Sequence, residues 1–493
     1  MQALYRYFAL AGAIALGLPA TLSSQAHAQG GVPLWTNFYN GTANGSDAPW
    51  SVAVDSHANV FVTGFSYQGS NYDVTTIKYT SAGVPAWTNL HGGQAATDIG
   101  LAVRVDPSDN VFVTGGASRD YATIAYSNSG SPLWTNRYNG PGDDYDRGDR
   151  IAVGLNGKIF VTGHSWGNGS AHDYATISYS SGGTPLWTNR YNGPGNGWDE
   201  PYGIAVDGTG NVFVIGYSQG PNSQKEYATI AYTRAGVPLW TNRYGVATNK
   251  NAEAHAIAVN NNGKIFVTGY AHSHTGLAND QDYVTVAYAH TGEALWTNRY
   301  AGTANGPDFA LGAVADAQSV YVTGSSRGSG GFAEYTTIKY SEVGTPLWTN
   351  RYAPMVSSPS VSAITLDSNG NVFVAGTAAI LAYSSSGLPL WTNAHDVSAK
   401  GICVDKEGNV FLTGLINSLG STDFATIKYS SSLRPYIFLQ SLDDQAVLIW
   451  SNASFRLQTA LTIDGIFTNI PGAISPHTNS SMGSQQYFRL SCP

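Results

Sequence analysis

Charge is scarce in this sequence, and positive charge is the scarcer sign. Charged residues make up 11% of the 493 residues, with 24 Lys and Arg against 32 Asp and Glu, for a formal net charge of −8. The basic residues are scattered, and no run of Lys or Arg occurs along the chain. Proteins that bind nucleic acid or an anionic membrane surface need a basic patch to attract phosphate groups. The composition therefore excludes nucleic acid as a partner.

Cysteine is almost absent as well. The two cysteines, Cys403 and Cys492, allow one disulfide at most, which would join the last repeat to the C-terminal end in an oxidising compartment. Their spacing does not decide whether that bond forms. Because an unpaired cysteine packs well as a small apolar side chain, we expect Cys403 to be buried and unpaired on an apolar strand.

Extended hydrophobic runs are missing except at the N-terminus. Residues 1–28 combine a basic residue, Arg6, an apolar stretch over 8–18 and a small-x-small cleavage pattern that ends at Ala28. These features are typical of a secretory signal peptide. The apolar stretch is shorter than the roughly 20 residues that a membrane-spanning helix needs. We therefore expect signal cleavage, a mature chain without a membrane span, and a location outside the cell, on its surface or in the periplasm.

Glycine and aromatic residues are plentiful, and they occur in a repeating order. The chain has 57 Gly, 30 Tyr and 12 Trp, which suits many short strands and tight turns. A Trp-Thr-Asn triplet recurs eight times with a mean spacing of about 51 residues. Its tryptophans are Trp35, Trp87, Trp134, Trp187, Trp240, Trp296, Trp348 and Trp391. Such a period indicates a repeat architecture.

Each repeat contains four short runs of β-branched and aromatic residues, separated by Gly, Asn, Ser and Pro. In one repeat the runs are 203–207, 211–216, 227–232 and 238–244. A four-stranded sheet of this size cannot bury both faces alone, whereas sheets arranged radially bury their faces against one another. The signature of the second run, typified by NVFVTG, begins at Asn59, Asn110, Lys158, Asn211, Lys264, Ser319, Asn371 and Asn409. We therefore predict an all-β fold, an eight-bladed β-propeller of four-stranded blades.

The two ends of the repeat region predict how the ring closes. The chain enters on a fourth-run segment, 33–39, and the last repeat stops after a third run, 424–429. The simplest closure makes 33–39 the outer strand of the eighth blade, which leaves no terminal edge strand open. Removing this segment should destabilise the whole ring.

The linked signatures AVDxxGNVFVTG, DYATIxY and GxPLWTNRYNGPG resemble the SBBP type of bacterial β-propeller repeat, found in secreted and cell-surface proteins. The resemblance covers about 31–432 and recurs in order eight times. It implies seven blades, so seven is the alternative to the eight counted here, and it brings no catalytic residues.

The repeat stops after Ser432. We predict three segments: a signal peptide over 1–28, the propeller over 30–432, and a small β-sandwich-like module over 433–493, where short apolar or alternating runs are separated by Gly, Pro, Asn and Ser. A stalk or an export tag is the alternative for the last segment.

Antiparallel order places the links between strands one and two and between strands three and four on one face of the ring. These links are short and uniform, and we call this the short-link face. The other links are long and differ from blade to blade, and they form the long-loop face. Because variable loops on a rigid scaffold commonly carry binding residues, we expect binding on the long-loop face.

Four aromatic residues near these loops are the candidate ligand-binding residues: Trp50, Trp166, Trp198 and Tyr202. Exposed tryptophans could stack on sugars or anchor a protein partner, or they could fill gaps between blades. His164 and His172 flank Trp166, and we expect them to be exposed loop histidines, with a zinc site as the alternative.

Acidic residues give a second candidate. The loop 140–150 contains Asp143, Asp144, Asp146 and Asp149, which are ligand types for calcium but lack the spacing of a calcium hand. We predict no obligatory cofactor, with calcium as the possible metal. Aspartates that recur in the long loops, among them Asp146, are expected to hydrogen-bond within those loops.

Taken together, these patterns predict a non-enzymatic, secreted or cell-surface binding scaffold, a monomer whose long-loop face contacts an extracellular glycan or protein. The alternative is an enzyme of the quinone-cofactor dehydrogenase type, because such propellers also carry Gly-x-x-x-Trp at blade ends, as in GEALW at 292–296.

Overall fold

The computed structural model describes residues 31–92, 97–246, 250–273, 280–304, 306–356, 359–418 and 420–430, together with parts of 438–491. In this part of the chain every regular element is a β-strand. No helix in the described residues has the length and apolar character needed to cross a membrane. The predicted signal peptide, 1–28, and Cys492 lie outside the described residues.

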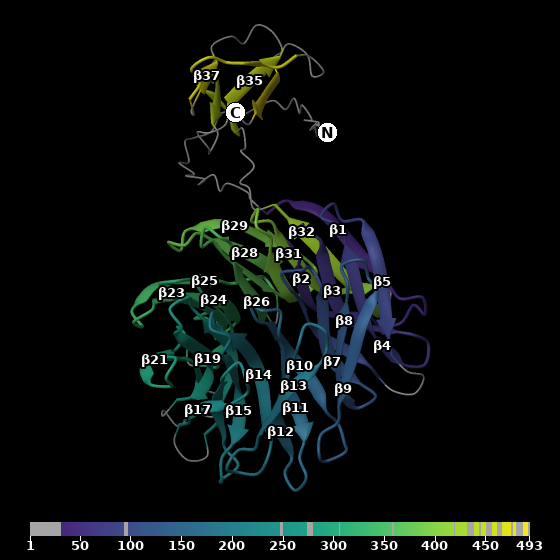
Figure 1. Ribbon diagram of the computed structural model, residues 1–493. Coiled ribbons are helices and arrows are strands. Elements are labelled where there is room, and N and C mark those ends of the chain that lie inside the picture. The colour runs from purple at the N-terminus through teal and green to yellow at the C-terminus, as the bar shows by residue number, and fades with distance from the viewer. Residues whose placement is uncertain are drawn as a thin grey trace.

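Eight antiparallel four-stranded sheets form the ring (Figure 1), as the repeat count predicted. The innermost strand of each blade comes first in its repeat, except that the chain begins with an outer strand. The inner strands are β2 (Ala48–Val54), β6 (Ile99–Val105), β10 (Arg147–Val153), β14 (Asp199–Val206), β18 (Ala252–Val259), β22 (Phe309–Ala315), β26 (Val361–Leu366) and β30 (Ser398–Val404). Each inner strand contacts the inner strand of the next blade, and β30 contacts β2, so the ring is closed.

The second and third strands form the middle of each blade and carry most of the buried residues. The second strands are β3 (Val60–Tyr67), β7 (Val111–Ala117), β11 (Ile159–Trp166), β15 (Val212–Gln219), β19 (Ile265–His272), β23 (Ser319–Arg327), β27 (Val372–Gly376) and β31 (Val410–Ser418). The third strands are β4 (Tyr72–Tyr79), β8 (Asp120–Tyr126), β12 (His172–Tyr179), β16 (Lys225–Tyr232), β20 (Gln281–Tyr288), β24 (Ala333–Ser341), β28 (Ala379–Tyr383) and β32 (Ser421–Tyr429). Their side chains pack against the adjacent blades, since both faces of every sheet are covered.

The outer strands carry the Trp-Thr-Asn triplets. They are β5 (Pro85–His91), β9 (Pro132–Tyr138), β13 (Pro185–Tyr191), β17 (Pro238–Tyr244), β21 (Ala294–Tyr300), β25 (Pro346–Tyr352), β29 (Pro389–Ala394) and β1 (Pro33–Tyr39). β1 pairs with β32, with Thr36 opposite Ile427, and so completes the eighth blade. The predicted closure by the N-terminal strand is confirmed.

One contact, which we call the Trp–Gly clasp, joins every outer strand to the next blade. The Trp187 indole lies between Phe160 of its own blade and Tyr232 of the next, at centroid distances of 5.9 and 5.8 Å. Asn189 Nδ2 donates a hydrogen bond of 2.7 Å to the carbonyl oxygen of Gly236. Gly236 has a φ of +82°, and a Cβ there would lie 2.6 Å from the Trp187 ring. Glycine is therefore required at this turn.

The clasp is repeated around the whole ring. The eight pairs are Trp35–Gly83, Trp87–Gly130, Trp134–Gly183, Trp187–Gly236, Trp240–Gly292, Trp296–Gly344, Trp348–Gly387 and Trp391–Gly31. In the last pair Asn393 donates a hydrogen bond to the carbonyl oxygen of Gly31, which lies two residues before β1. The recurring tryptophans are thus packing residues between blades.

The described part of the C-terminal segment contains two three-stranded antiparallel sheets. One is formed by β33 (Phe438–Leu442), β34 (Gln445–Ile449) and β37 (His477–Asn479), and the other by β35 (Arg456–Ala460), β36 (Thr468–Asn469) and β38 (Tyr487–Ser491). Leu448 of the first sheet and Leu457 of the second belong to one small apolar cluster. The boundary of this segment at 433 stays a prediction.

Cys403 of β30 carries a free thiol and packs in the apolar cluster between the eighth and first blades. Burial raises the pKa of this thiol well above its usual value. Cys403 was predicted to be buried and unpaired on an apolar strand; it is unpaired and half-buried.

Candidate binding site on the long-loop face

Every inner strand contains a β-bulge at the same place. In β14 the pairing with β15 shifts between Pro201 and Gly203, so Tyr202 has no partner across the ladder. The same shift occurs in the other seven blades. A bulge re-aims one side chain while the strand continues. The eight bulge residues, which we call the bulge ring, are Trp50, Leu101, Asp149, Tyr202, His255, Leu311, Ser362 and Lys400.

The bulge ring lies near the long-loop end of the inner strands, and its members differ in size, charge and polarity. Neighbouring members touch at two places. Tyr202 and His255 stack with a centroid distance of 5.0 Å and an interplanar angle of 10°. The Lys400 ammonium lies 4.9 Å from the centre of the Trp50 ring. The ring thus presents varied chemistry from one repeated backbone feature.

Aromatic side chains extend from the bulge ring over the third, fourth and fifth blades. We call this set the aromatic arc. Its members come from the ends of strands and from the loops beside them, and they include two residues of the bulge ring. They are His164, Trp166, His172, Trp198, Tyr202, Tyr217, His255 and Tyr270.

The most exposed part of the aromatic arc is a three-ring cluster. Trp166 and Trp198 meet edge to face at 5.9 Å, and both contact His172, at 4.9 and 4.3 Å. Trp198 is 41% exposed, whereas His172 beneath it is 8% exposed. The His172 ring also stacks on His164 at 4.6 Å. The cluster therefore offers a fixed tryptophan surface on a buried support.

Carboxylates run beside the aromatic rings. Asp149 Oδ2 lies 3.0 Å from His164 Nδ1, and Asp149 Oδ1 accepts a hydrogen bond of 2.8 Å from Arg147 Nε. Burial opposes ionisation of Asp149, but the hydrogen bond and charge of His164, followed by the charge of Arg147, outweigh burial and lower its pKa. Asp149 is therefore a paired, ionised carboxylate.

Glu200 and Glu253 occupy the same position, two residues before the bulge, in adjacent blades. The Tyr202 hydroxyl donates a hydrogen bond of 3.2 Å to Glu200, and Lys225 donates one of 3.0 Å to Glu253. The nearby His172, 3.8 Å away, lowers the pKa of Glu200 most, against the effect of burial. Glu200 is thus ionised at neutral pH, and both acids lie between aromatic rings.

His255 closes the arc on the fifth blade. It stacks on Tyr202 on one side and on Tyr270 on the other, at centroid distances of 5.0 and 5.5 Å. Burial, which outweighs the opposing charge of Glu253, lowers the pKa of His255 to about 4. His255 is therefore neutral at physiological pH and acts as an aromatic ring there.

The structure brings three of the four predicted ligand-binding residues together. Trp166 and Trp198 contact each other, and Tyr202 is linked to them through Glu200 and His172. Trp50 belongs to the bulge ring but lies on the first blade, where it contacts Lys400 of the eighth. It is 40% exposed and does not join the arc.

The four aspartates predicted as possible calcium ligands have separate partners. Asp143 accepts a hydrogen bond from Asn139, and Asp144 pairs with Arg119 at 3.7 Å. Asp146 is buried and accepts hydrogen bonds from the backbone amides of Gly140 and Trp166. Asp149 is engaged by His164 and Arg147, as described above. Calcium binding by this loop stays a prediction.

The loop role predicted for the recurring aspartates is confirmed. Asp146, Asp199 and Asp308 each accept hydrogen bonds from the loop amide six residues earlier and from an amide at the end of the second strand. The prediction of exposed histidines was wrong, since His164 and His172 are 6% and 8% exposed. Stacking on each other and beneath Trp198 covers both rings.

The sequence analysis missed Tyr217, His255 and Tyr270 of the arc, and Glu200 and Glu253 beside it. A signal for two of them exists. The residue directly after the recurring second-strand glycine varies among otherwise similar repeats, and it is His164, Tyr217 and Tyr270 in the three blades of the arc. Variation at a fixed position in a repeat marks these residues better than loop length does.

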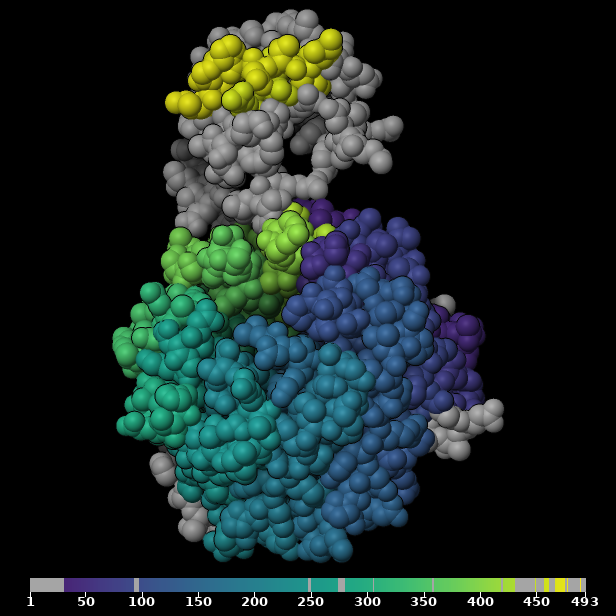
Figure 2. All heavy atoms as spheres, in the orientation of Figure 1, coloured from purple at the N-terminus to yellow at the C-terminus, as the bar shows by residue number. Residues whose placement is uncertain are grey.

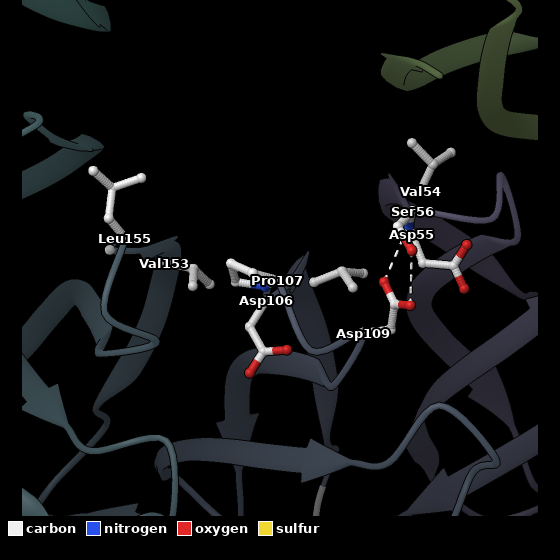
Figure 3. Close-up of a pocket in the computed structure, with 10 residues that line it drawn as sticks. Val54, Asp55, Ser56, Asp106, Pro107, Asp109, Val153 and Leu155 are labelled. Atoms are coloured by element: carbon white, nitrogen blue, oxygen red, sulfur yellow. Dashed lines mark hydrogen bonds between the residues drawn. The ribbon is translucent and has the colours of Figure 1, made fainter. Parts of the chain in front are cut away.

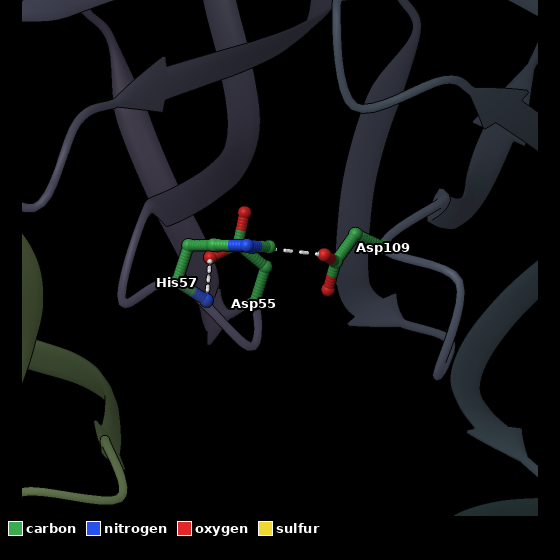
Figure 4. A group of neighbouring side chains, drawn as sticks. All are labelled: Asp55, His57 and Asp109. Carbon is green, nitrogen blue, oxygen red and sulfur yellow. Dashed lines mark hydrogen bonds and ion pairs between the residues drawn. The ribbon is translucent and has the colours of Figure 1, made fainter.

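The short-link face has a pocket of about 320 Å³ between the ends of β2, β6 and β10 (Figure 3). Beside it lie Asp55, His57 and Asp109 (Figure 4), the one group of three possible metal ligands found in the described part of the chain. Asp55 accepts hydrogen bonds from the amides of His57 and Asn59, at 2.9 and 2.8 Å, and from two side chains. Turn hydrogen bonds therefore occupy the Asp55 carboxylate, and His57 Nδ1 lies 3.1 Å from Asp109 Oδ2.

Comparison with known proteins agrees with this architecture. A family model described as a β-propeller repeat, SBBP, matches residues 186–222. No curated protein matches the chain. Among solved structures, Sqt1 of Chaetomium thermophilum bound to the N-terminus of ribosomal protein L10 is 10% identical, with a TM-score of 0.54, over 80% of this chain and 98% of that one. BamB of Moraxella catarrhalis is 14% identical, with a TM-score of 0.43, over 80% and 99%. At these identities the likeness concerns the fold alone.

Proposed function

The chain is a β-propeller repeat protein, and we propose that it is a non-enzymatic binding scaffold, exported from the cell, whose aromatic arc on the long-loop face binds an extracellular glycan or protein. The observation that carries this proposal is the arc itself. Aromatic rings and ionised carboxylates gather on three adjacent blades, whereas the outer strands of the same blades repeat almost unchanged.

The chemistry of the arc favours a glycan over a protein. The apolar C–H faces of a sugar stack on aromatic rings, and its hydroxyl groups donate hydrogen bonds to carboxylates. Trp198 is exposed beside Trp166, and Glu200 lies next to the same cluster. A long-chain glycan could extend from this cluster along the arc towards Tyr202 and His255.

The alternative of a quinone-type dehydrogenase loses one of its supports. It was suggested by the Gly-x-x-x-Trp pattern at Gly292. A Cβ on Gly292 would lie 2.7 Å from the ring of Trp240 on the preceding blade, so this glycine belongs to the Trp–Gly clasp. The pattern is explained by packing between blades.

A glycan array probed with the mature protein tests the proposal. We expect binding to one class of extracellular polysaccharide, and loss of at least about tenfold in affinity when Trp198 is changed to Ala. Leu155→Ala is the matched control, because Leu155 is a 76% exposed apolar side chain on the short-link face. A protein ligand would instead appear in a pull-down that Trp198→Ala abolishes. Binding that is unaffected by Trp198→Ala would refute the proposed site.

A further inference from the structure

After the bulge, each inner strand carries mostly small side chains. Two positions matter, one and three residues after each bulge. The first holds Ser51, Ala102, Arg150, Gly203, Ala256, Gly312, Ala363 and Gly401, and the second holds Ala53, Arg104, Ala152, Ala205, Ala258, Val314, Thr365 and Cys403. Pairing confirms the equivalence, since residues of the second set each lie opposite the Phe or Tyr of the second-strand signature. Arg104 and Arg150 are the two long and charged exceptions.

The two arginines have no carboxylate in contact among the described residues. Arg104 Nη1 donates to the carbonyl oxygen of Val103 at 2.8 Å, and Arg150 Nη1 donates to that of Asp149 at 2.9 Å. The carboxylate of Asp149 is engaged elsewhere, by Arg147 and His164. Both arginines are exposed residues, and each guanidinium group has further N–H donors beyond the one bond named above.

The two charges lie close to each other and to the centre of the ring. They are carried by adjacent inner strands, β6 and β10, which contact each other. The charge of Arg104 also lowers the pKa of the Cys403 thiol on β30, against the larger effect of burial. The whole first blade separates β6 from β30 in the order of the ring. Figure 1 shows β2, β10, β14 and β26 grouped around the middle of the propeller. Desolvation by the surrounding protein, followed by the charge of Arg150, lowers the pKa of Arg104.

The pocket on the short-link face lies at the ends of the same inner strands. It is lined by Val105 and Val153, the last residues of β6 and β10, together with Val54 of β2. Val105 directly follows Arg104 in the chain. Asp55, Asp106 and Asp109 also line this pocket and neither arginine does, so the pocket forms no part of the proposed anion site.

We propose that Arg104 and Arg150 form a binding site for a small oxyanion, of the phosphate or sulfate class, at the centre of the ring. Two neighbouring guanidinium groups repel each other, and an anion that bridges them removes this repulsion. Arginine forks match the oxygen atoms of phosphate and sulfate, and enclosure by protein strengthens such charge-assisted hydrogen bonds. The site is independent of the aromatic arc and of the proposed glycan. It places a positive spot inside a protein whose net charge is −8.

Titration calorimetry of the full mature chain with inorganic phosphate, and separately with sulfate, tests this site at constant ionic strength balanced with NaCl. We expect one anion to bind per chain. Arg104→Ala and Arg150→Ala should each weaken binding by at least about tenfold. Arg234→Ala is the control, since Arg234 is an exposed arginine on the turn before β17 and its loss changes the net charge equally.

The two variants are expected to fold, because the repeat itself places Ala at the same positions in other blades, at Ala152 and Ala102. Their melting temperatures without phosphate should match that of the wild type, and phosphate should raise the melting temperature of the wild type only. The proposal fails if neither anion binds the wild type. It also fails if Arg234→Ala weakens binding as much as Arg104→Ala does, since that result means general charge attraction.

Discussion

The outer and inner strands of the propeller follow opposite rules. At the rim, the Trp–Gly clasp is the same in all eight blades, from the ring contacts of Trp187 to the φ of its partner Gly236. At the centre, the backbone bulge is repeated but the residue on it is different, from Trp50 to Asp149 to Lys400. What is repeated in both side chain and backbone holds the ring together. What is repeated in backbone alone is available for binding.

The physical reason lies in the surroundings of each position. The indole in the clasp touches two blades and spans a glycine that cannot accept a side chain, so few substitutions fit. A bulge residue points out of the ladder near the long-loop face and has no partner across the sheet. Each bulge side chain can therefore change without disturbing the sheet. The space-filling view shows the closely packed wall of blades that results (Figure 2).

Deleting residues 33–39 should have the largest effect, since it removes a whole outer strand and the Trp35–Gly83 clasp. We expect a loss of more than about 5 kcal/mol in the free energy of unfolding, because β32 is left as an open edge. The measurement is urea denaturation followed by circular dichroism. As a control, a permuted chain that carries residues 31–40 after Ser430 should recover the stability. A deletion variant as stable as the wild type would contradict closure by β1.

Trp187→Ala and Trp198→Ala should distinguish a residue that stabilises the ring from a residue that binds ligand. The first removes a clasp and should lower the free energy of unfolding by about 3 kcal/mol without loss of glycan binding. The second removes an exposed ring and should cost less than about 1 kcal/mol while abolishing binding. Denaturation and the glycan assay are read on both proteins. The comparison breaks down if each variant loses stability and binding in the same proportion.

Gly236→Ala sharpens the argument about the clasp. The added Cβ would lie 2.6 Å from the Trp187 ring at a φ of +82°, so we expect a cost of roughly 2–4 kcal/mol. Gly169→Ala is the matched control, because Gly169 has a φ of +90° and a Cβ added there would have nothing within 4 Å. That variant should lose only about 1 kcal/mol from backbone strain. Equal losses would mean that the contact with Trp187 is unimportant.

The smallest expected effect is a pH dependence at the bulge ring. The pKa of His255 is lowered to about 4. As the pH falls below about 6.5, the unfolded chain binds a proton at this histidine before the folded protein does, so stability decreases down to about pH 4. Its side chain is 24% exposed, and we therefore expect a loss of about 1–2 kcal/mol over this range.

His255→Phe should remove this part of the pH dependence while it keeps the stack with Tyr202. Thermal unfolding from pH 4 to pH 7 measures the effect. Tyr202→Phe is the control, because it preserves the same stack and removes a group that does not titrate in this range. If the slope of stability against pH survives in His255→Phe, the neutral histidine is not its source.

The fold could be predicted almost completely from the sequence, because the clasp requires the same residues in every blade. Trp35 at the start of the chain and Phe424 near its end already identified the closing strand. The site could be predicted only in part. Trp166 and Trp198 were found because they lie beside long loops, but Tyr217 and Tyr270 lie within second strands, where only the variable residue after the recurring glycine distinguishes them. The bulges left no sequence signal, since a shift in hydrogen-bond register does not depend on which residue is unpaired.

The His164 and His172 rings illustrate the same limit. Their neighbours in the chain are polar and glycine-rich, as in an exposed loop, yet the two rings stack on each other and Trp198 from the next blade packs against His172. Burial of this kind depends on contact between blades. It appears only when the angle and distance between adjacent sheets are known.

The strand that closes the ring also sets the order in which the ring can be made. β1 is synthesised first, but its partner β32 is synthesised only after seven blades have followed it. Until then β1 has no strand to pair with, and the amide of Gly31 has no Ser430 carbonyl oxygen to which it can donate. Contacts between such distant segments form slowly in folding. Closure therefore requires the complete repeat region. A chain that ends before β32 leaves β1 without a partner strand.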